Sequence, residues 1–193
     1  VSVLFPSLSV TVLNDVDAAH LGAFAGGPGI LVLSGTGSMA WARDAAGRSY
    51  RTGGWGDRIG DEGSSHWIGQ RVLGLVSQSL DGRAPPTALV AAVFAHLGLD
   101  AGDPMNSLEG WAAHLDNPRA EIAALAPLVS RAAEAGDAAA SSLIKEAAAE
   151  LARHVTAIAR QGRLPADWSF AGGAFASRPL RDAVAAALGR RPA

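Results

Sequence analysis

The chain has 193 residues, a net charge of −2 and 49% hydrophobic residues, so it is long enough for a globular domain and lacks the electrostatic signature of a nucleic-acid or anionic-membrane partner. It contains no Cys, which excludes disulfides, thiolate catalysis and a Cys-ligated zinc or iron–sulfur site supplied by this chain, and which fits a cytoplasmic protein. No apolar run approaches the roughly 20 residues that a membrane-spanning helix needs. The chain starts with Val1 in what reads as the middle of a fold, so we expect an N-terminal part to be missing.

The first predicted elements are a short strand and a short helix. The β-branched run 10–13 is typical of a buried strand, and residues 17–24 favour a helix with Asp15 or Asp17 near its start. Open α/β sheets place ligand-facing groups where a strand ends before a helix, which is where Asp15 lies. An N-cap is the alternative for Asp15, and position alone favours the cap. The glycine-rich loop 25–29 then marks a domain boundary.

A three-stranded antiparallel meander is predicted next, with strands at 30–33, 39–42 and 48–51. The first turn contains Gly35-Thr36-Gly37-Ser38, whose consecutive backbone N–H groups can form an anion-binding nest. The alternative is an ordinary hairpin loop, because one such tetrapeptide is weak evidence for phosphate binding.

Loop 52–60 is too rich in glycine to be regular, and a helix is predicted from Asp61 to Leu80. Trp55 stands between glycines, so its ring either packs under the loop or faces a ligand as an apolar platform. Asp61 is interpreted as a helix cap unless the neighbouring glycines make it part of a site, since acids also suit the positive end of a helix.

The second half of the chain is predicted to be helical, followed by one more strand. Helices are predicted at 87–97 with Thr87 as a candidate cap, 107–114, 118–134 and 138–160, then a strand at 168–171, Gly172-Gly173, and a final helix capped by Ser177. His96, His114 and His154 lack the spacing of metal ligands and are interpreted as surface or packing residues, and nothing near His66 identifies it as a base.

Several of these motifs occur together and in a consistent order. They are Asn14-Asp15, the GTGS turn, GGWG at 53–56, GDEGS at 60–64, Trp67-Ile68-Gly69, Gly136-Asp137, and Gly172-Gly173 to Ser177. This series resembles the N-acetylglucosamine kinase branch of the BadF/BadG/BcrA/BcrD ATPase family, within the actin-like, hexokinase and Hsp70 superfamily. The resemblance covers nearly the whole chain, and the GTGS, GGWG and GDEGS series is its specific part.

The resemblance implies an α/β fold, namely the C-terminal lobe of a ribonuclease H-like actin/hexokinase ATPase fold. A three-stranded antiparallel meander and further strands would be covered by helices. Residues 1–25 would be the end of an N-terminal lobe, and residues 26–193 the C-terminal lobe of a sugar kinase that uses ATP and Mg²⁺.

The resemblance also implies residue roles. Asp15 would be the catalytic base that takes the proton of the sugar 6-hydroxyl, and with the resemblance in view we favour this role over the cap. The phosphates of ATP would be held by Thr36, Gly37 and Ser38, and the adenosine surrounded by Ala133, Gly172, Gly173 and Ser177. The amino sugar would contact Asn14, Asp15, Gly54, Trp55, Gly56 and Asp61, and no residue of this chain is assigned to a metal.

One departure from the family pattern limits what this chain is expected to do alone. Such kinases begin with a glycine-rich DGGGT-type phosphate loop on an N-terminal strand, and no such motif occurs here. We therefore expect that the chain alone does not bind Mg-ATP productively. Its expected partners are an amino sugar, the missing N-terminal lobe and a second copy in a homodimer, without nucleic acid or membrane.

Two other functions stay open at this point. One is the activator ATPase branch of the same family, which serves acyl-CoA dehydratases or reductases; the lack of Cys argues against it, because those activators hold an iron–sulfur cluster. The other is a non-catalytic sugar- or nucleotide-binding remnant. The sequence does not choose between N-acetylglucosamine and glucosamine.

Overall fold

A computed structural model describes residues 13–164 and 167–192 of the chain. The strands are β1 (Gly29–Ser34), β2 (Ser38–Arg43), β3 (Ser49–Gly53) and β4 (Trp168–Ala171). The helices are α1 (Asp15–Phe24), α2 (Ser65–Leu80), α3 (Leu89–Leu97), α4 (Pro104–Ala113), α5 (Pro118–Ala123), α6 (Ala126–Glu134), α7 (Ala138–Gly162) and α8 (Arg178–Leu188), with a short 3₁₀ helix η1 (Gly173–Ala176).

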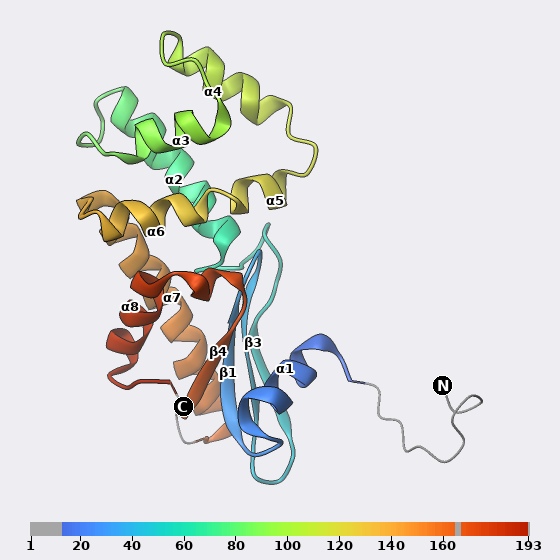
Figure 1. The fold of residues 1–193 in the computed structure, drawn as a ribbon. Helices are drawn as coiled ribbons and strands as arrows, with labels where there is room; N and C mark the ends of the chain where they lie inside the picture. Colours follow the sequence, from blue (N-terminus) through green and yellow to red (C-terminus); the bar gives the residue numbers. More distant parts are fainter. Residues whose placement is uncertain (1–12, 165–166, 193) are drawn as a thin grey trace.

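The four strands form one mixed sheet in the order β3-β2-β1-β4 (Figure 1). β1 pairs with β2 and β2 with β3 in antiparallel fashion, so the predicted meander is confirmed. The predicted strand at 168–171 is also confirmed, and it runs parallel to β1, with Ile30 opposite Trp168 and Leu33 opposite Ala171. The α/β class follows from this sheet and the helices around it.

Helices cover both faces of the central strand β1. Ile30 and Val32 are fully buried in the main hydrophobic core, and α7 contacts β1, β2 and β3. Leu31 is fully buried too, although alternate residues of a strand point to opposite faces. The second face is covered by α1, which contacts β1, β2 and β4 and lies in front of the sheet in Figure 1.

The helices between α2 and α6 gather at one end of the sheet (Figure 1). α2 and α5 approach each other closely: a Cβ built on Gly69 would lie 1.9 Å from the carbonyl oxygen of Ile122. Only a residue without a side chain permits this backbone contact.

Several predicted helix boundaries were wrong. The helix predicted over 118–134 is two helices, α5 and α6, because Pro127 lies in the first turn of α6 and a proline inside a continuous helix would remove a hydrogen bond and clash with the preceding turn. α2 begins at Ser65 rather than Asp61, with Ser64 as its N-cap, and α4 begins at Pro104 rather than residue 107. α3 begins at Leu89 after Ala88, two residues later than predicted, and the Thr87 hydroxyl accepts the Leu89 N–H at 3.2 Å, so Thr87 satisfies a backbone donor at the start of this helix.

Other boundaries agree better with the prediction. α1 begins two residues before the expected start, α7 extends two residues further than expected, and Ser177 caps α8 as predicted, accepting a hydrogen bond from the Leu180 N–H at 3.2 Å. Residues 10–12 of the strand predicted at 10–13 lie outside the described residues, and Leu13 is not in a strand. No helix within residues 13–164 and 167–192 combines the length and the apolar character that crossing a bilayer requires.

His154 on α7 packs against the end of β3. A Cβ on Gly53 would lie 2.7 Å from the ring carbon Cε1 of His154, and the Thr52 hydroxyl donates to the His154 carbonyl at 3.0 Å. Burial lowers the pKa of His154 below its usual 6.5, more than the nearby charges of Glu62, Glu150 and Asp61 raise it. His154 is thus a packing residue, one of the two interpretations predicted for it.

We expect Gly69→Ala to lower the free energy of unfolding by about 1–3 kcal/mol or more, because the added methyl group must push α5 away from α2. Gly74→Ala is the matched control on the same helix, since nothing lies within 4 Å of a Cβ there. That change should be neutral or stabilise by up to about 1 kcal/mol. Urea denaturation of the three proteins measures both effects, and equal destabilisation by the two changes would contradict the packing described.

The lowered pKa of His154 predicts a pH dependence of stability. The folded state binds this proton less readily than the unfolded state, so its contribution is fully present above pH 6.5 and is lost as the pH falls from 6.5 through the folded-state pKa. His154→Gln should flatten the dependence of the unfolding free energy on pH in this range. His96→Gln is the control, because His96 is exposed. If His154→Gln left the slope of the unfolding free energy against pH unchanged, the His154 imidazole would not contribute to the pH dependence of stability.

Candidate functional site

The glycine turn between β1 and β2 is fixed to the segment that leads into α2. The Ser38 hydroxyl donates to the carbonyl of Glu62 at 2.7 Å, and the Ser65 N–H donates to the carbonyl of Gly35 at 2.8 Å. The Ser38 hydroxyl is therefore already engaged within the protein, whereas Thr36, at the tip, is exposed. The turn is more than an ordinary hairpin loop, because its conformation is set by a segment well beyond the hairpin.

Asp61 lies directly beside this turn and is buried, with 2% of its surface exposed. Its carboxylate accepts hydrogen bonds from the Ser38 N–H (3.3 Å) and from Nη2 of Arg119 (2.6 Å). Its backbone has a φ of +62°, which is uncommon for a residue other than glycine. Because Ser64 caps α2, the alternative that Asp61 is a helix cap was wrong.

Gly37 lies against this ion pair. A Cβ at that position would lie 2.7 Å from Nη2 of Arg119 and 2.8 Å from Oδ2 of Asp61. A side chain at position 37 would therefore require the ends of Arg119 and Asp61 to shift.

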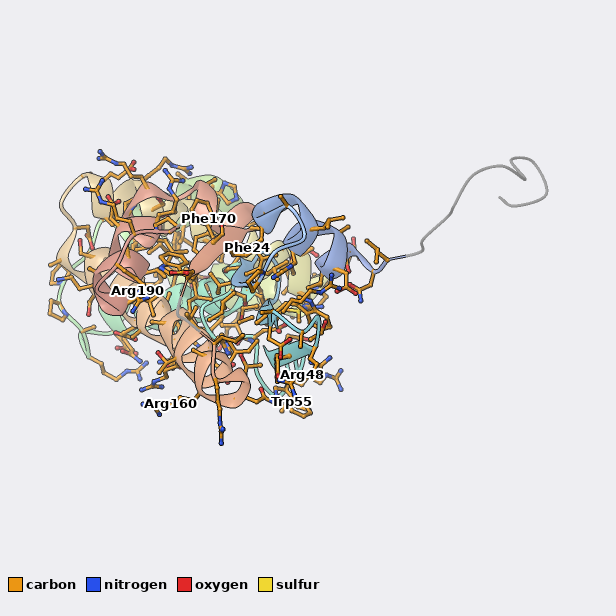
Figure 2. The ribbon with its side chains drawn as sticks, turned by 90° about the horizontal axis from the view of Figure 1, so that it is seen from below. Phe24, Arg48, Trp55, Arg160, Phe170 and Arg190 are labelled. Atoms are coloured by element: carbon orange, nitrogen blue, oxygen red, sulfur yellow. The ribbon has the colours of Figure 1, made fainter. Side chains whose placement is uncertain are left out.

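The GGWG loop is attached to the other side of the turn. The Gly54 N–H donates to the Ser38 carbonyl at 2.9 Å. Trp55 is 66% exposed, its ring centroid lies 6.0 Å from the guanidinium carbon of Arg51, and Figure 2 shows it at the edge of the molecule. Of the two alternatives for the Trp55 ring, packing under the loop was wrong; the ring is accessible to a ligand.

Three glycines of the loop have positive φ values, namely Gly53 (+73°), Gly54 (+71°) and Gly56 (+85°).

A cavity of about 240 Å³ lies between α2, α6, η1 and the start of α8. Gly173 and Ser177 line it, and Ser65, which binds the Gly35 carbonyl, links it to the glycine turn. The Ser130 hydroxyl donates to the Ser177 hydroxyl at 2.8 Å across its wall. The other lining residues are Ile68, Ala126, Pro127, Arg131, Glu134, Ile144, Ala174, Ala176 and Leu180.

The corner between β4 and η1 brings this cavity close to the end of β1. Gly172 has a φ of +103°, and a Cβ there would lie 2.3 Å from the carbonyl oxygen of Ser34. The Ser34 hydroxyl in turn donates to the Gly63 carbonyl at 2.9 Å. Segments 34–38, 60–65 and 172–177 therefore meet at one place.

Ala133, which was expected to lie near the adenosine, does not line this cavity. Its side chain is half-buried and packs against the hydrophobic core, while its neighbours on α6, Ser130 and Glu134, line the cavity. Sequence reasoning missed these two residues. Their spacing of four places them on one helix face and is the signal that could have found them.

Asn14 and Asp15 lie at the start of α1. Asn14 is the N-cap and accepts the Asp17 N–H at 2.7 Å, so the cap alternative for Asp15 was wrong. The Asp15 carboxylate is exposed and accepts the N–H of Val16 at 3.0 Å. In the part of the chain that the structure describes, no hydrogen bond or ion pair joins Asp15 to the glycine turn or to Asp61.

A larger cavity of about 580 Å³ lies between α2, the 85–86 segment and the start of α7, where Asp137 contributes to its lining. Asp137 is the N-cap of α7 and also accepts the Thr87 hydroxyl and the Ala88 N–H, each at 2.8 Å. Burial alone would raise the pKa of this carboxyl, but these hydrogen bonds outweigh burial and lower it. The Gly136-Asp137 motif thus has a structural role here.

Comparison with known proteins identifies relatives over most of the chain. An N-acetylmuramic acid/N-acetylglucosamine kinase of Clostridium acetobutylicum is 36% identical over 149 residues, which are 77% of this chain and 48% of that protein. The glucosamine kinase GspK of Vibrio cholerae is 31% identical over 157 residues, or 81% of this chain and 51% of that protein. The chain thus spans about half the length of these kinases.

Solved structures show the same fold. A candidate N-acetylglucosamine kinase of Chromobacterium violaceum superposes with a TM-score of 0.76 at 33% identity, over 95% of this chain and 62% of that one. A structure from Porphyromonas gingivalis, at 20% identity and a TM-score of 0.67, covers 90% of this chain and 58% of its own, and shares the fold. The sequence matches one family from residue 7 to residue 191, and the chain belongs to that family, the BadF/BadG/BcrA/BcrD ATPase family.

Proposed function

We propose that this chain is the C-terminal part of an ATP-dependent amino sugar kinase, which transfers the γ-phosphoryl group of ATP to the 6-hydroxyl of N-acetylglucosamine or glucosamine. One observation carries the proposal: the glycine turn is fixed between a cavity and the GGWG loop. Ser65 connects the turn to the cavity, and Gly54 connects it to the loop. The names of the kinases that resemble the chain support the same reaction.

In this proposal the turn receives the phosphates of ATP. Phosphoryl transfer depends mainly on positioning and on electrostatic stabilisation of the transferred group. Thr36, which is exposed at the tip, and the backbone of Gly37 contact the phosphates in this proposal. Ser38 acts indirectly, because its hydroxyl and N–H are bound to Glu62 and Asp61 and hold the turn in shape.

The adenosine occupies the 240 Å³ cavity in this proposal. Gly173 and Ser177 form part of its wall, and Gly172 sets the close approach of that wall to β1. Ala133 contributes through the packing of α6.

The sugar lies on the other side of the turn, against Gly54, Trp55 and Gly56. The proposed contact with Asp61 requires a change at this residue on binding, because its carboxylate is buried and bonded to Ser38 and Arg119. An exposed aromatic ring offers an apolar platform for a sugar face. Asp15 takes the proton of the 6-hydroxyl as the γ-phosphoryl group is transferred and ADP leaves. Asn14 precedes it as the N-cap of α1, and the Asp15 carboxylate is exposed at the start of this helix.

Mg²⁺ is expected to accompany the ATP, since Mg²⁺ usually keeps several waters and binds phosphates with only one or two carboxylates. Residues 13–164 and 167–192 contain no group of three or more His, Asp or Glu side chains that could hold a metal ion. Asp61, the acid beside the turn, is already paired with Arg119. No step of the proposal therefore uses a metal ligand from these residues.

The proposal includes a second lobe from the same protein, and residues 1–25 form the end of that lobe. It also includes a cytoplasmic location. A homodimer also remains an expectation. The activator ATPase is the weaker alternative, since this chain supplies no Cys for an iron–sulfur cluster and the relatives above are sugar kinases.

The proposal is tested by assaying the product of the whole reading frame that contains this chain for ADP release with N-acetylglucosamine and with glucosamine. Asp15→Asn should lower kcat about a hundredfold to ten-thousandfold while largely sparing ATP affinity, because the general base is lost. Asp17→Asn, two residues further along α1, is the matched control. Absence of turnover with every amino sugar would reject the kinase, and equal kcat values for the two variants would remove Asp15 from the role of base.

Trp55→Ala should raise KM for the sugar several-fold to about tenfold and change KM for ATP little, because the ring is a contact surface for the sugar only. Ile59→Ala is the control, since Ile59 is 76% exposed on the same loop. Steady-state kinetics with each substrate varied separately measures both constants. An equal rise in the two KM values for Trp55→Ala would assign the ring a structural role instead.

A further inference from the structure

The carboxylate of Asp61 depends on one cation. It is buried and charged, and a buried carboxylate is costly unless it is paired and hydrogen-bonded. Within the described residues, Arg119 is the only Lys, Arg or His that forms an ion pair with it, at 2.6 Å. Without Arg119, an uncompensated negative charge would lie directly beside the turn.

Arg119 reaches this place from a helix whose position is set independently. It lies in the first turn of α5, where Asn117 is the N-cap and accepts the Ala120 N–H at 3.3 Å. α5 is seated on α2 through the close contact between Gly69 and Ile122. The guanidinium is therefore delivered to the turn by the packing of two helices, although 43% of the Arg119 side chain is exposed.

The same guanidinium lies against the backbone of the turn. Its Nη2 atom would be 2.7 Å from a Cβ on Gly37, and its partner Asp61 holds the N–H of Ser38. One cation thus controls both the charge beside the turn and the hydrogen bond that shapes it. Arg119 also lies 3.8 Å from the half-exposed carboxylate of Asp57, so one guanidinium serves two acids, and the closer one is the buried Asp61. A negatively charged ligand would be repelled more strongly by Asp61 alone than by Asp61 paired with Arg119.

We propose that Arg119 is a positioning residue: it neutralises Asp61 and thereby holds the glycine turn in the conformation and charge state that accept a phosphate. The role of Arg119 in phosphate binding rests on the proposed function, whereas its role in positioning the turn does not. The inference adds to the site a residue from α5 that lies 58 positions from its partner in sequence.

The positioning is tested by amide hydrogen exchange of Ser38, followed by NMR in the ligand-free 193-residue chain. Arg119→Gln should speed this exchange about tenfold or more. This factor corresponds to the free energy of one charge-assisted hydrogen bond. Arg119→Lys should retain much of the protection, because a cation remains. Arg58→Gln is the matched control, since Arg58 lies on the loop next to Asp61 and makes no ion pair within the described residues.

A charge role is separated from a packing role by the double variant Asp61→Asn/Arg119→Gln. It removes the buried charge together with its partner, so the exchange of Ser38 should be slower than in Arg119→Gln alone. Equal exchange in Arg119→Gln and Arg58→Gln, or faster exchange in the double variant than in Arg119→Gln, would overturn the positioning of the turn by charge.

The phosphate part is tested by titrating the product of the whole reading frame with ATP. Arg119→Gln should weaken ATP binding about tenfold or more, and the double variant should recover part of the affinity, because the buried charge of Asp61 is gone while the half-exposed Asp57 keeps its charge. Unchanged affinity in Arg119→Gln would overturn this part. If the unaltered protein binds no ATP, the proposed function fails, and the exchange measurements still decide whether Arg119 positions the turn.

Discussion

Backbone-to-backbone contact at glycines holds the three segments of the site together. Gly172 meets the carbonyl of Ser34, and a Cβ on Gly63 would lie 2.7 Å from the carbonyl oxygen of Ala147 in α7. These contacts leave no room for even a methyl group, so the end of β1, the segment before α2 and the corner after β4 take one mutual arrangement. The ion pair between Asp61 and Arg119 fits into the small space that Gly37 leaves.

Most buried polar groups of the site bind one another. The hydroxyls of Ser34 and Ser38 bind carbonyls of the segment before α2, and the hydroxyl of Ser64 accepts the N–H of Trp67 at 3.1 Å. Such a framework is rigid and presents few side chains to a ligand, among them Thr36 and Trp55. This suits a reaction in which the protein mainly positions groups that carry the chemistry themselves.

The local features of the fold could be predicted from the sequence, and the non-local ones could not. The meander and Ser177 as a cap depend on neighbouring residues, so turn and capping patterns were sufficient for them. Asp61 was misplaced in a helix because acids also suit the positive end of a helix; the structure instead caps α2 with Ser64, three residues further on. Arg119 carries no local signal at all, since its contact with Asp61 depends on how α5 packs on α2. For the same reason sequence spacing could not show that β4 lies beside β1.

The parallel pairing of β1 with β4 also has a consequence for how the molecule assembles. The strands lie near opposite ends of the described chain, and all helices from α2 to α7 come between them. Contacts between such distant segments are slow to form, because the intervening chain must first be ordered. During synthesis the meander can form early, whereas the wall made by Gly173 and Ser177 exists only after the last strand has been made. The cavity is therefore completed late in folding, because part of its wall comes from η1 and the start of α8.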